Sequence, residues 1–284
     1  MMKQQAIQEV LERIKGLPTL PDTLSKMNEL VGNPNTTARQ VGQLIASDPP
    51  VAAKTLKVVN SSFYGFPTRV TTITHAIVIL GFNTVRTLVL SSSVMNALGD
   101  KSCKMYSKGF WKHCVATGAA AKVIAQLLGY RALEEFFIAG LLHDIGKIVI
   151  SKYLEEEYDG IARAVAERDI LMYDAEEDLL HGVTHADIAG TLFERWNLPK
   201  GLVKSVTYHH TPTLAGDEMR ITSILHLADI MARALMIGNP GDHKIPTIDA
   251  QAWAETGLKT SDFGRIFSLI DRETKKAAVF LEIV

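Results

Sequence analysis

The segment AGLLHDIGKIVI, residues 139–150, places His143 and Asp144 side by side in a run that otherwise suits the interior of a helical protein. Lys147 follows three positions later. Moving an imidazole and a carboxylate out of water costs free energy unless something pairs with them. The sequence therefore predicts a partner for this pair, and a divalent cation is one candidate.

Titratable residues recur in apolar helical surroundings on four further segments. Imidazole nitrogen and carboxylate oxygen together suit ions such as Mn²⁺, Fe²⁺ or Zn²⁺. The set is larger than one ion needs and would hold two ions if Asp144 bridged them. Two metals about 3.5–4 Å apart can clamp a phosphoryl group and activate a water, and Lys147 could neutralise a phosphate oxygen. The seven predicted ligands are His113, His143, Asp144, His185, His209, His210 and Asp229.

Each histidine also has a simpler interpretation, because a single helical histidine is more often hydrogen-bonded or solvated than a ligand. We assign His75 and His243 to that class. An outer-shell position is open to His226, three residues before Asp229, but we assign it to the core or the surface. His181 and His185 have i, i+4 spacing but no glutamate between them, so a zinc protease is excluded. Spacing alone leaves both a metal site and a set of ordinary histidines open.

The elements that must position these residues are helical almost throughout. Apolar residues recur with a helical period over 104–128, 132–150, 153–168, 174–195 and 217–238, with a shorter helix before His209. In the first hundred residues, Thr36 or Thr37 and Asp48 are candidate helix caps. The β-branched segment 70–80 is also expected to be helical. We predict an all-α fold of two packed helical lobes, the second an HD-like bundle.

Gly99 and Asp100 mark a candidate domain boundary. The sequence predicts an N-terminal lobe over 1–100, a metal-binding lobe over 101–240 and a helical extension over 241–284. Of 284 residues 47% are hydrophobic, so a sizeable core is expected, and the net charge of −1 gives no general attraction to nucleic acid or acidic membranes. Two cysteines without CxxC spacing indicate a reducing compartment. We find no signal peptide and no stretch of membrane-spanning length, so we expect a cytoplasmic protein.

These motifs resemble two related families. LLHDIGK resembles the signature of the HD phosphohydrolase superfamily, in which an earlier histidine, the His-Asp pair and a later aspartate bind one metal. His113, His143, Asp144 and Asp229 match those positions. The HD-GYP cyclic-dinucleotide phosphodiesterases add ligands for a second metal, and His185, His209 and His210 match those.

A narrower resemblance is to the HDOD family of bacterial signalling proteins. It covers about residues 12–237, through segments such as LPTLPDTLSKMNELV, LIASDPPVAAKTLKVVNSSFYG, ITHAIVILGFNTVRTLVL and LLHGVTHADIAGTLFERWNLP. The resemblance implies an N-terminal helical lobe packed on an HD-like lobe, and a role in signal transduction.

Two departures from these families matter. HDOD members commonly lack part of the HD ligand set, whereas this sequence keeps every position that can be aligned. Conversely, TPTLAGDEM stands where HD-GYP enzymes have Gly-Tyr-Pro, and Gly109 stands where some have an acidic third-metal ligand. The first departure implies one or two bound ions of iron, manganese or zinc. The second argues against transferring cyclic di-GMP hydrolysis.

Three functions compete. The first is a metal-dependent phosphohydrolase or phosphodiesterase acting on a phosphoester or nucleotide, with Asp144 and Lys147 as catalytic residues. The second is a non-catalytic signalling adaptor or ligand sensor that binds a signalling protein through the HD-like lobe scaffold. The third is helix-turn-helix DNA binding by residues 37–60, which we disfavour because the second helix offers Lys54 and Lys57 but no arginine.

Overall fold

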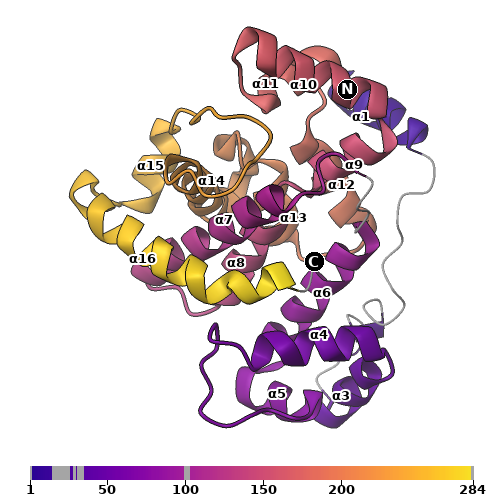
Figure 1. Ribbon diagram of the computed structural model, residues 1–284, viewed down its shortest axis with the longest axis vertical. Coiled ribbons are helices and arrows are strands. Elements are labelled where there is room, and N and C mark those ends of the chain that lie inside the picture. Colours follow the sequence, from indigo (N-terminus) through magenta and orange to yellow (C-terminus); the bar gives the residue numbers. More distant parts are fainter. Residues whose placement is uncertain (1, 15–25, 28–29, 31–34, 99–102, 283–284) are drawn as a thin grey trace. The chain divides into compact units, whose positions relative to one another are not determined.

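The computed structural model describes residues 2–14, 26–27, 30, 35–98 and 103–282. Every regular element in these ranges is a helix, which confirms the predicted all-α class (Figure 1). The chain forms two compact units, one of Met1–Leu17 and Asp100–Asp271 and one of Pro18–Gly99 and Arg272–Val284. Within the described ranges, no helix is both long and apolar enough to cross a membrane.

The larger unit contains most of the helices. They are α1 (Met2–Arg13), α7 (Lys108–Leu127), α8 (Leu133–Leu142), α9 (Ile145–Tyr153), α10 (Glu155–Arg168), α11 (Met172–Leu179), α12 (His185–Arg195), α13 (Lys200–Thr207), η1 (Pro212–Glu218), α14 (Met219–Ala234), α15 (Ala250–Thr256) and η2 (Thr260–Asp262), together with most of α16 (Phe263–Lys276).

The smaller unit contains α3 (Ala38–Ala46), α4 (Pro49–Val59), α5 (Ile73–Leu80), α6 (Phe82–Leu98) and η3 (Ala277–Glu282). Thr37 caps α3 in a capping box with Gln40, and Asp48 caps α4 by accepting from the Val51 N–H. The β-branched segment is helical, as expected, and its helix begins at Ile73.

The division into units differs from the predicted domains at both ends of the chain. The predicted boundary near residue 100 coincides with a boundary between the units. Residues 1–17 group with the larger unit instead of the N-terminal lobe, and residues 241–271 group with it as well. The last residues, 272–284, group with the smaller unit. The predicted functional division into three segments stays a prediction.

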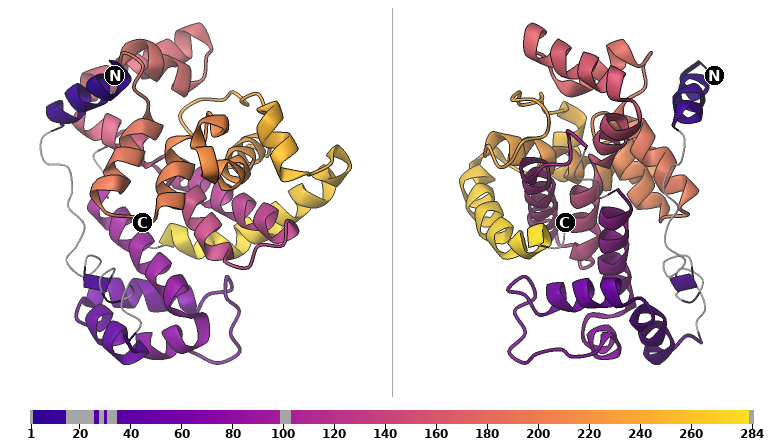
Figure 2. Two further views of the ribbon diagram at one scale, coloured as in Figure 1. Left: turned by 180° about the vertical axis from the view of Figure 1, so that it is seen from behind. Right: turned by 45° about the vertical axis from the view of Figure 1, so that its right-hand side comes forward.

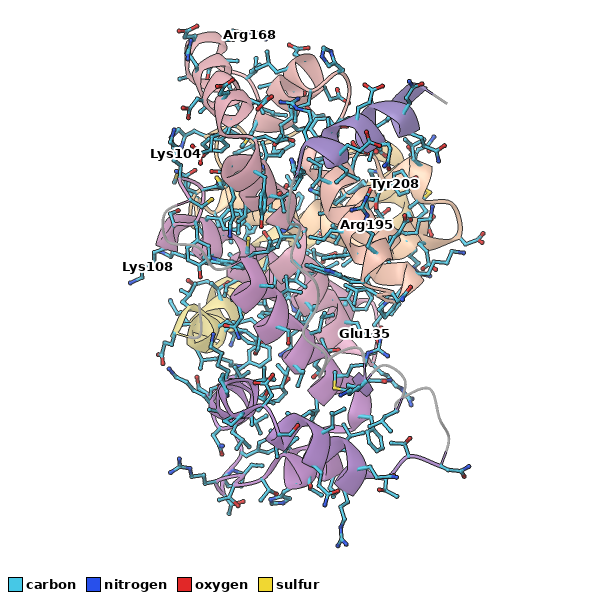
Figure 3. All side chains as sticks on the ribbon, turned by 90° about the vertical axis from the view of Figure 1, so that its right-hand side faces the viewer. Lys104, Lys108, Glu135, Arg168, Arg195 and Tyr208 are labelled. Carbon is cyan, nitrogen blue, oxygen red and sulfur yellow. The ribbon has the colours of Figure 1, made fainter. Side chains whose placement is uncertain are left out.

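Helices α7 and α14 form the centre of the larger unit, and α7 contacts both α8 and α14 (Figures 1 and 2). A Cβ added at Gly140 of α8 would lie 2.5 Å from the Gly118 nitrogen of α7, so only glycine permits this approach. Charged side chains such as Lys108, Glu135 and Arg195 lie on the outside (Figure 3). The apolar core of the unit is formed by α7, α14 and α16, with buried residues that include Ala121, Ile124, Leu227, Met231, Ile266 and Ile270.

The predicted helix over 132–150 is wrong in one respect: it breaks at the His-Asp pair. Helix α8 ends at Leu142 and α9 begins at Ile145, with His143 and Asp144 between them. The Lys147 N–H bonds to the Asp144 carbonyl three residues back, which tightens the turn. A Cβ at Gly146 would overlap the backbone of His185. The junction therefore sits directly against the start of α12.

The predicted helix over 174–195 is likewise two helices, α11 and α12. His181 and Gly182 have positive φ values of 54° and 85°, so they form a left-handed turn that a continuous helix cannot contain. Thr184 then starts α12 through a capping box with Asp187. This turn places His185 at the first position of a helix, facing the His-Asp junction.

Candidate metal centre

Five parts of the larger unit bring their titratable side chains to one place. Helix α7 supplies His113, the α8–α9 junction supplies His143 and Asp144, and α12 supplies His185 from its first turn. His209 and His210 follow α13, and Asp229 lies on α14. The structure thus brings all seven predicted ligands together, although their role as ligands stays a prediction. Six of the seven are buried, and His210 is half-buried.

One group, here called the 113 half-site, consists of His113, His143, Asp144 and Asp229. The Nε2 atom of His113 lies 3.0 Å from Asp229 Oδ1 and 3.7 Å from Asp144 Oδ2. His143 Nε2 lies 3.3 Å from Asp144 Oδ2 and 3.7 Å from Asp229 Oδ1. Two nitrogens and two oxygens from three separate segments therefore face one small space.

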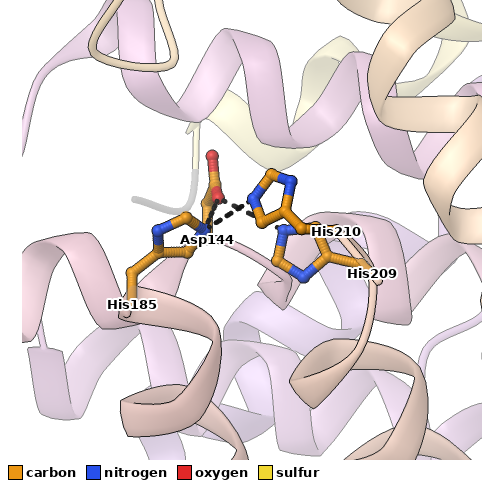
Figure 4. Close-up of side chains that lie close together, drawn as sticks. All are labelled: Asp144, His185, His209 and His210. Atoms are coloured by element: carbon orange, nitrogen blue, oxygen red, sulfur yellow. Dashed lines mark hydrogen bonds and ion pairs between the residues drawn. The ribbon is translucent and has the colours of Figure 1, made fainter. Parts of the chain in front are cut away.

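The second group, here called the 185 half-site, consists of Asp144, His185, His209 and His210 (Figure 4). His185 Nε2 lies 3.1 Å from Asp144 Oδ1 and 3.1 Å from His210 Nε2. His209 Nε2 lies 3.9 Å from the same Asp144 oxygen. Asp144 thus presents Oδ2 to the 113 half-site and Oδ1 to the 185 half-site. This is the arrangement that a bridging carboxylate requires.

Hydrogen bonds on the far side of two rings, those of His143 and His209, fix their orientation. His143 Nδ1 lies 2.7 Å from the Gly140 carbonyl, and His209 Nδ1 lies 2.7 Å from the Val206 carbonyl. A carbonyl can only accept, so Nδ1 must carry the hydrogen in both rings and donate it. In the neutral imidazole, each Nε2 then presents a lone pair inward, as a metal ligand must.

The inward-facing atoms lack other partners. His143 Nε2, His209 Nε2 and Asp144 Oδ1 are buried and make no hydrogen bond of good geometry to any described residue. Buried polar atoms are almost always satisfied, so three unsatisfied atoms around one space call for a missing group. A divalent cation fits this donor set of imidazole nitrogens and carboxylate oxygens.

The charges of the buried groups also favour a bound cation. Four carboxylates linked by hydrogen bonds to the cluster or its neighbours are buried, as are two cations, Lys147 and Arg233. With every histidine neutral, as metal ligands must be, this leaves two negative charges out of contact with water. Without a cation, the raised pKa values of His143 and His185 favour bound protons that offset part of this charge. Such an excess is costly, and a bound cation would offset it. The carboxylates are Asp144, Glu176, Asp229 and Asp242.

The pKa values of the histidines show two different environments. Burial opposes the charging of His143, but the nearby carboxylates of Asp144 and Asp229 raise its pKa to about 9. Burial holds the pKa of His209 and of His210 well below the usual value, and neighbouring histidines add to the effect. Asp144 is also buried, but the charges of His143 and Lys147 keep its pKa well below the usual range. The Asp144 carboxylate is therefore ionised.

Lys147 is fully buried and holds this carboxylate. Its Nζ donates to Asp144 Oδ2 at 2.8 Å and to the Pro240 carbonyl at 3.0 Å. Two of its three N–H groups are therefore engaged with the protein. The predicted contact between Lys147 and a substrate phosphate stays a prediction, whereas its contact with Asp144 is direct.

The remaining histidines are either exposed or in the outer shell of the site. His75, His181 and His243 are exposed. His226 is buried, donates from Nδ1 to the His209 carbonyl at 2.8 Å and accepts the Asp249 N–H at 3.1 Å. It therefore belongs to the outer shell of the site, where it holds the backbone of a predicted ligand.

Three charged residues next to the site were missed by the sequence reasoning. Arg233 donates to Asp229 at 3.2 Å and to Asp242 at 2.9 Å. The i, i+4 spacing of Asp229 and Arg233 on one helix was an available signal. Glu176 contacts His185 across a left-handed turn that no pattern predicted, and Asp242 lies in a loop, so neither had a comparable signal.

The comparison with known families agrees with these observations. The HDOD domain matches residues 17–212, more than half of the chain. This chain belongs to the HDOD domain family. A relative from Treponema pallidum (strain Nichols), named "Uncharacterized protein", is 28% identical over 228 residues, which are 80% of this chain and 44% of that relative. The chain thus spans less than half of that protein.

Solved structures share the fold of this HDOD protein. An HDOD domain protein of unknown function from Geobacter sulfurreducens has a TM-score of 0.80 at 22% identity, covering 99% of this chain and 97% of that one. A protein named "Putative phosphohydrolase" from Shewanella amazonensis SB2B has a TM-score of 0.75 at 25% identity, covering 98% and 97%. A "Putative signal transduction protein" from Marinobacter aquaeolei VT8 has a TM-score of 0.78 at 21% identity, covering 99% and 65%.

Proposed function

We propose that this HDOD protein is a metal-dependent phosphohydrolase that acts on a phosphoester or nucleotide in bacterial signal transduction. The observation that carries the proposal is the position of Asp144, whose two oxygens face two separate groups of imidazole nitrogens. The ions would be iron, manganese or zinc. Two such ions would polarise a phosphoryl oxygen and lower the pKa of a water to near neutrality.

The protein supplies the rigid frame for that chemistry. Carbonyl acceptors at Gly140 and Val206 fix two rings, and Lys147 fixes the bridging carboxylate. Arg233 holds Asp229 in the same way on the opposite side of the 113 half-site. Because these partners are themselves buried, little reorganisation is needed when a cation binds.

His210 marks the side on which a substrate would approach. It is half-buried, whereas the other six predicted ligands are buried. The Tyr173 ring lies against it, with the ring centroids 4.5 Å apart. A phosphoester that approaches there reaches the 185 half-site first. The absence of a Gly-Tyr-Pro segment after His210 argues against cyclic di-GMP as the substrate.

A signalling adaptor is the second candidate. The HDOD match extends over α3 to α6, which form the smaller unit and contribute no predicted ligand. On α5, Val78 and Ile79 are adjacent apolar residues with exposed fractions of 71% and 42%. This supports a surface for a signalling protein, with the metal lobe as its scaffold. We expect such a partner, and the protein itself, in the cytoplasm.

Turnover of generic phosphoesters tests the proposal. The metal-free protein is loaded separately with Mn²⁺, Fe²⁺ and Zn²⁺, and hydrolysis of p-nitrophenyl phosphate and its diester is followed. We expect turnover by at least one form, its loss in Asp144→Asn, and its retention in His243→Ala, whose histidine is exposed. Full metal occupancy without turnover in any form would favour the adaptor instead.

A further inference from the structure

Glu176 is a buried carboxylate that is not among the seven predicted metal ligands. It lies on α11 and is fully inaccessible to solvent. Its Oε2 atom accepts the backbone N–H of His185 at 2.8 Å and lies 2.6 Å from the ring Nδ1 of the same residue. Its Oε1 atom has no hydrogen-bond partner among the described residues. This buried carboxylate therefore interacts with His185.

The position of Glu176 relative to the ring excludes it from the inner set of ligands. It contacts Nδ1, whereas Nε2 on the other side of the imidazole faces Asp144. A carboxylate that accepts from Nδ1–H leaves the lone pair on Nε2 and makes that nitrogen more basic. His143 and His209 bond through Nδ1 to neutral carbonyls, so of these three rings only His185 has an anion behind it.

We propose that Glu176 is the positioning residue of the 185 half-site. It fixes His185 with Nε2 toward Asp144 and thereby sets how tightly that half-site holds its cation. This inference rests on the proposed function, because it concerns an ion bound at that site. The 113 half-site has no contact with Glu176 among the described residues, so its ion should be much less affected.

Titration of the metal-free full chain with Mn²⁺ separates the two half-sites. In Glu176→Gln, which keeps the size of the side chain but loses its charge, we expect one of two ions to bind about 10- to 100-fold more weakly. The other ion should bind as in the wild type. Glu177→Gln is the matched control, because the neighbouring glutamate is exposed and its side chain accepts only from Tyr173 in the contacts described.

A double-mutant cycle tests whether Glu176 acts through His185. His185→Ala should weaken the same ion, and adding Glu176→Gln to it should cause no further loss. A residue that merely stabilised α11 would weaken binding in both backgrounds. Long-range ¹H–¹⁵N spectra of the metal-free protein at high pH, where the ring is neutral, supply a second measurement. They should show His185 protonated at Nδ1 in the wild type and a mixture of tautomers in Glu176→Ala.

The outcomes distinguish this inference from the proposed function. Equal Mn²⁺ affinities of the wild type and Glu176→Gln, with two ions bound by each, would overturn the role of Glu176 and leave the metal centre intact. Additive losses in the double mutant, or a wild-type His185 protonated at Nε2, would do the same. A wild-type chain that binds no ion would overturn the proposed function, and this inference with it.

Discussion

The two half-sites share Asp144 but differ in their other ligands and in the charged residues behind those ligands. The 113 half-site has two imidazoles and two carboxylates, and cations lie behind the carboxylates: Lys147 on Asp144 and Arg233 on Asp229. The 185 half-site has three imidazoles and one carboxylate, and an anion, Glu176, lies behind one ring. Oxygen-rich sites suit harder ions such as Mn²⁺, whereas imidazole-rich sites suit iron or zinc. The difference indicates that the two positions need not prefer the same metal.

The half-sites also differ in how the chain builds them. The 113 half-site relies on α7, α14 and the end of α8, which meet in the packed core of the unit. The 185 half-site relies on the first residue of α12 and on the turn after α13. Helix ends and turns have fewer fixed neighbours than helix interiors, so we expect the 185 half-site to need its outer-shell contacts more.

Replacement of Asp144 should abolish the distinction between the half-sites. In Asp144→Asn both half-sites lose their shared carboxylate charge, so we expect neither ion to be retained. The buried Lys147 also loses its counter-charge, which should destabilise the metal-free protein by roughly 3 kcal/mol. Metal analysis after gel filtration and urea unfolding measure the two effects. Retention of two ions by this variant would show that Asp144 does not bridge them.

Replacement of one histidine from each half-site should sharpen the distinction. We expect His113→Ala to lose the ion of the 113 half-site and His209→Ala to lose the ion of the 185 half-site, each retaining the other. Competition between Mn²⁺ and Zn²⁺ in the two variants would then show the preference of each remaining site. Identical preferences in both variants would contradict the argument from ligand chemistry.

The pH should act on both half-sites, through His143 in the 113 half-site and through His185 in the 185 half-site. The pKa of His143 is raised from 6.5 to about 9, so a cation must displace a proton from this ring at neutral pH. We expect the affinity of that half-site to rise about tenfold per pH unit up to that pKa and then to level off. In the 185 half-site, the low pKa values of His209 and His210 predict no proton release from those two rings. Burial opposes the charging of His185, but the Glu176 carboxylate raises its pKa, so this ring should also release a proton. Calorimetry in buffers of different ionisation enthalpy counts the protons.

The same raised pKa predicts an opposite dependence for the stability of the metal-free protein. A group whose pKa is higher in the folded state binds more protons there than in the unfolded state. The stabilisation by protonated His143 is therefore fully present below pH 6.5 and is lost as pH rises through about 9. A chain whose metal-free stability rose over that range would contradict the assignment of the proton to His143.

Gly146→Ala should lower the stability of the protein by a smaller amount, by displacing the backbone of the 185 half-site. A Cβ here would overlap the backbone of His185, so the start of α12 must shift. Overpacking of this kind costs roughly 1–3 kcal/mol. Gly160→Ala is the control, because its Cβ would meet only Leu179 at 3.7 Å. Equal thermal melting of the two variants would show that the α9–α12 contact tolerates adjustment.

The sequence predicted the helical class and the convergence of residues better than it predicted helix boundaries. Helical periodicity depends on neighbours three and four positions away in the sequence. The helices α7 and α14 could therefore be predicted from local sequence alone. The breaks at His143–Asp144 and at His181–Gly182 were missed, because they depend on contacts with distant elements. The junction after Leu142 is pressed against α12, and no local residue signals that contact.

Prediction of the candidate site was limited in the same way, because contacts between distant segments could not be foreseen. The predicted ligands could be gathered because each is a titratable residue in apolar surroundings, and burial of such residues demands a partner. Glu176 could not be found in this way, because it stands among exposed acidic residues of α11, Glu177 and Asp178. Its burial depends on the turn that reverses the chain before His185, a feature that follows from three-dimensional packing and not from period or spacing.

Anomalous diffraction from crystals of the metal-loaded full chain tests the central claim most directly. We predict two peaks separated by about 3.5–4 Å, one on each side of the Asp144 carboxylate, with His113 and His143 next to one and His185 and His209 next to the other. A fully loaded protein with no peak beside Asp144, or with its ions bound elsewhere, would contradict the account.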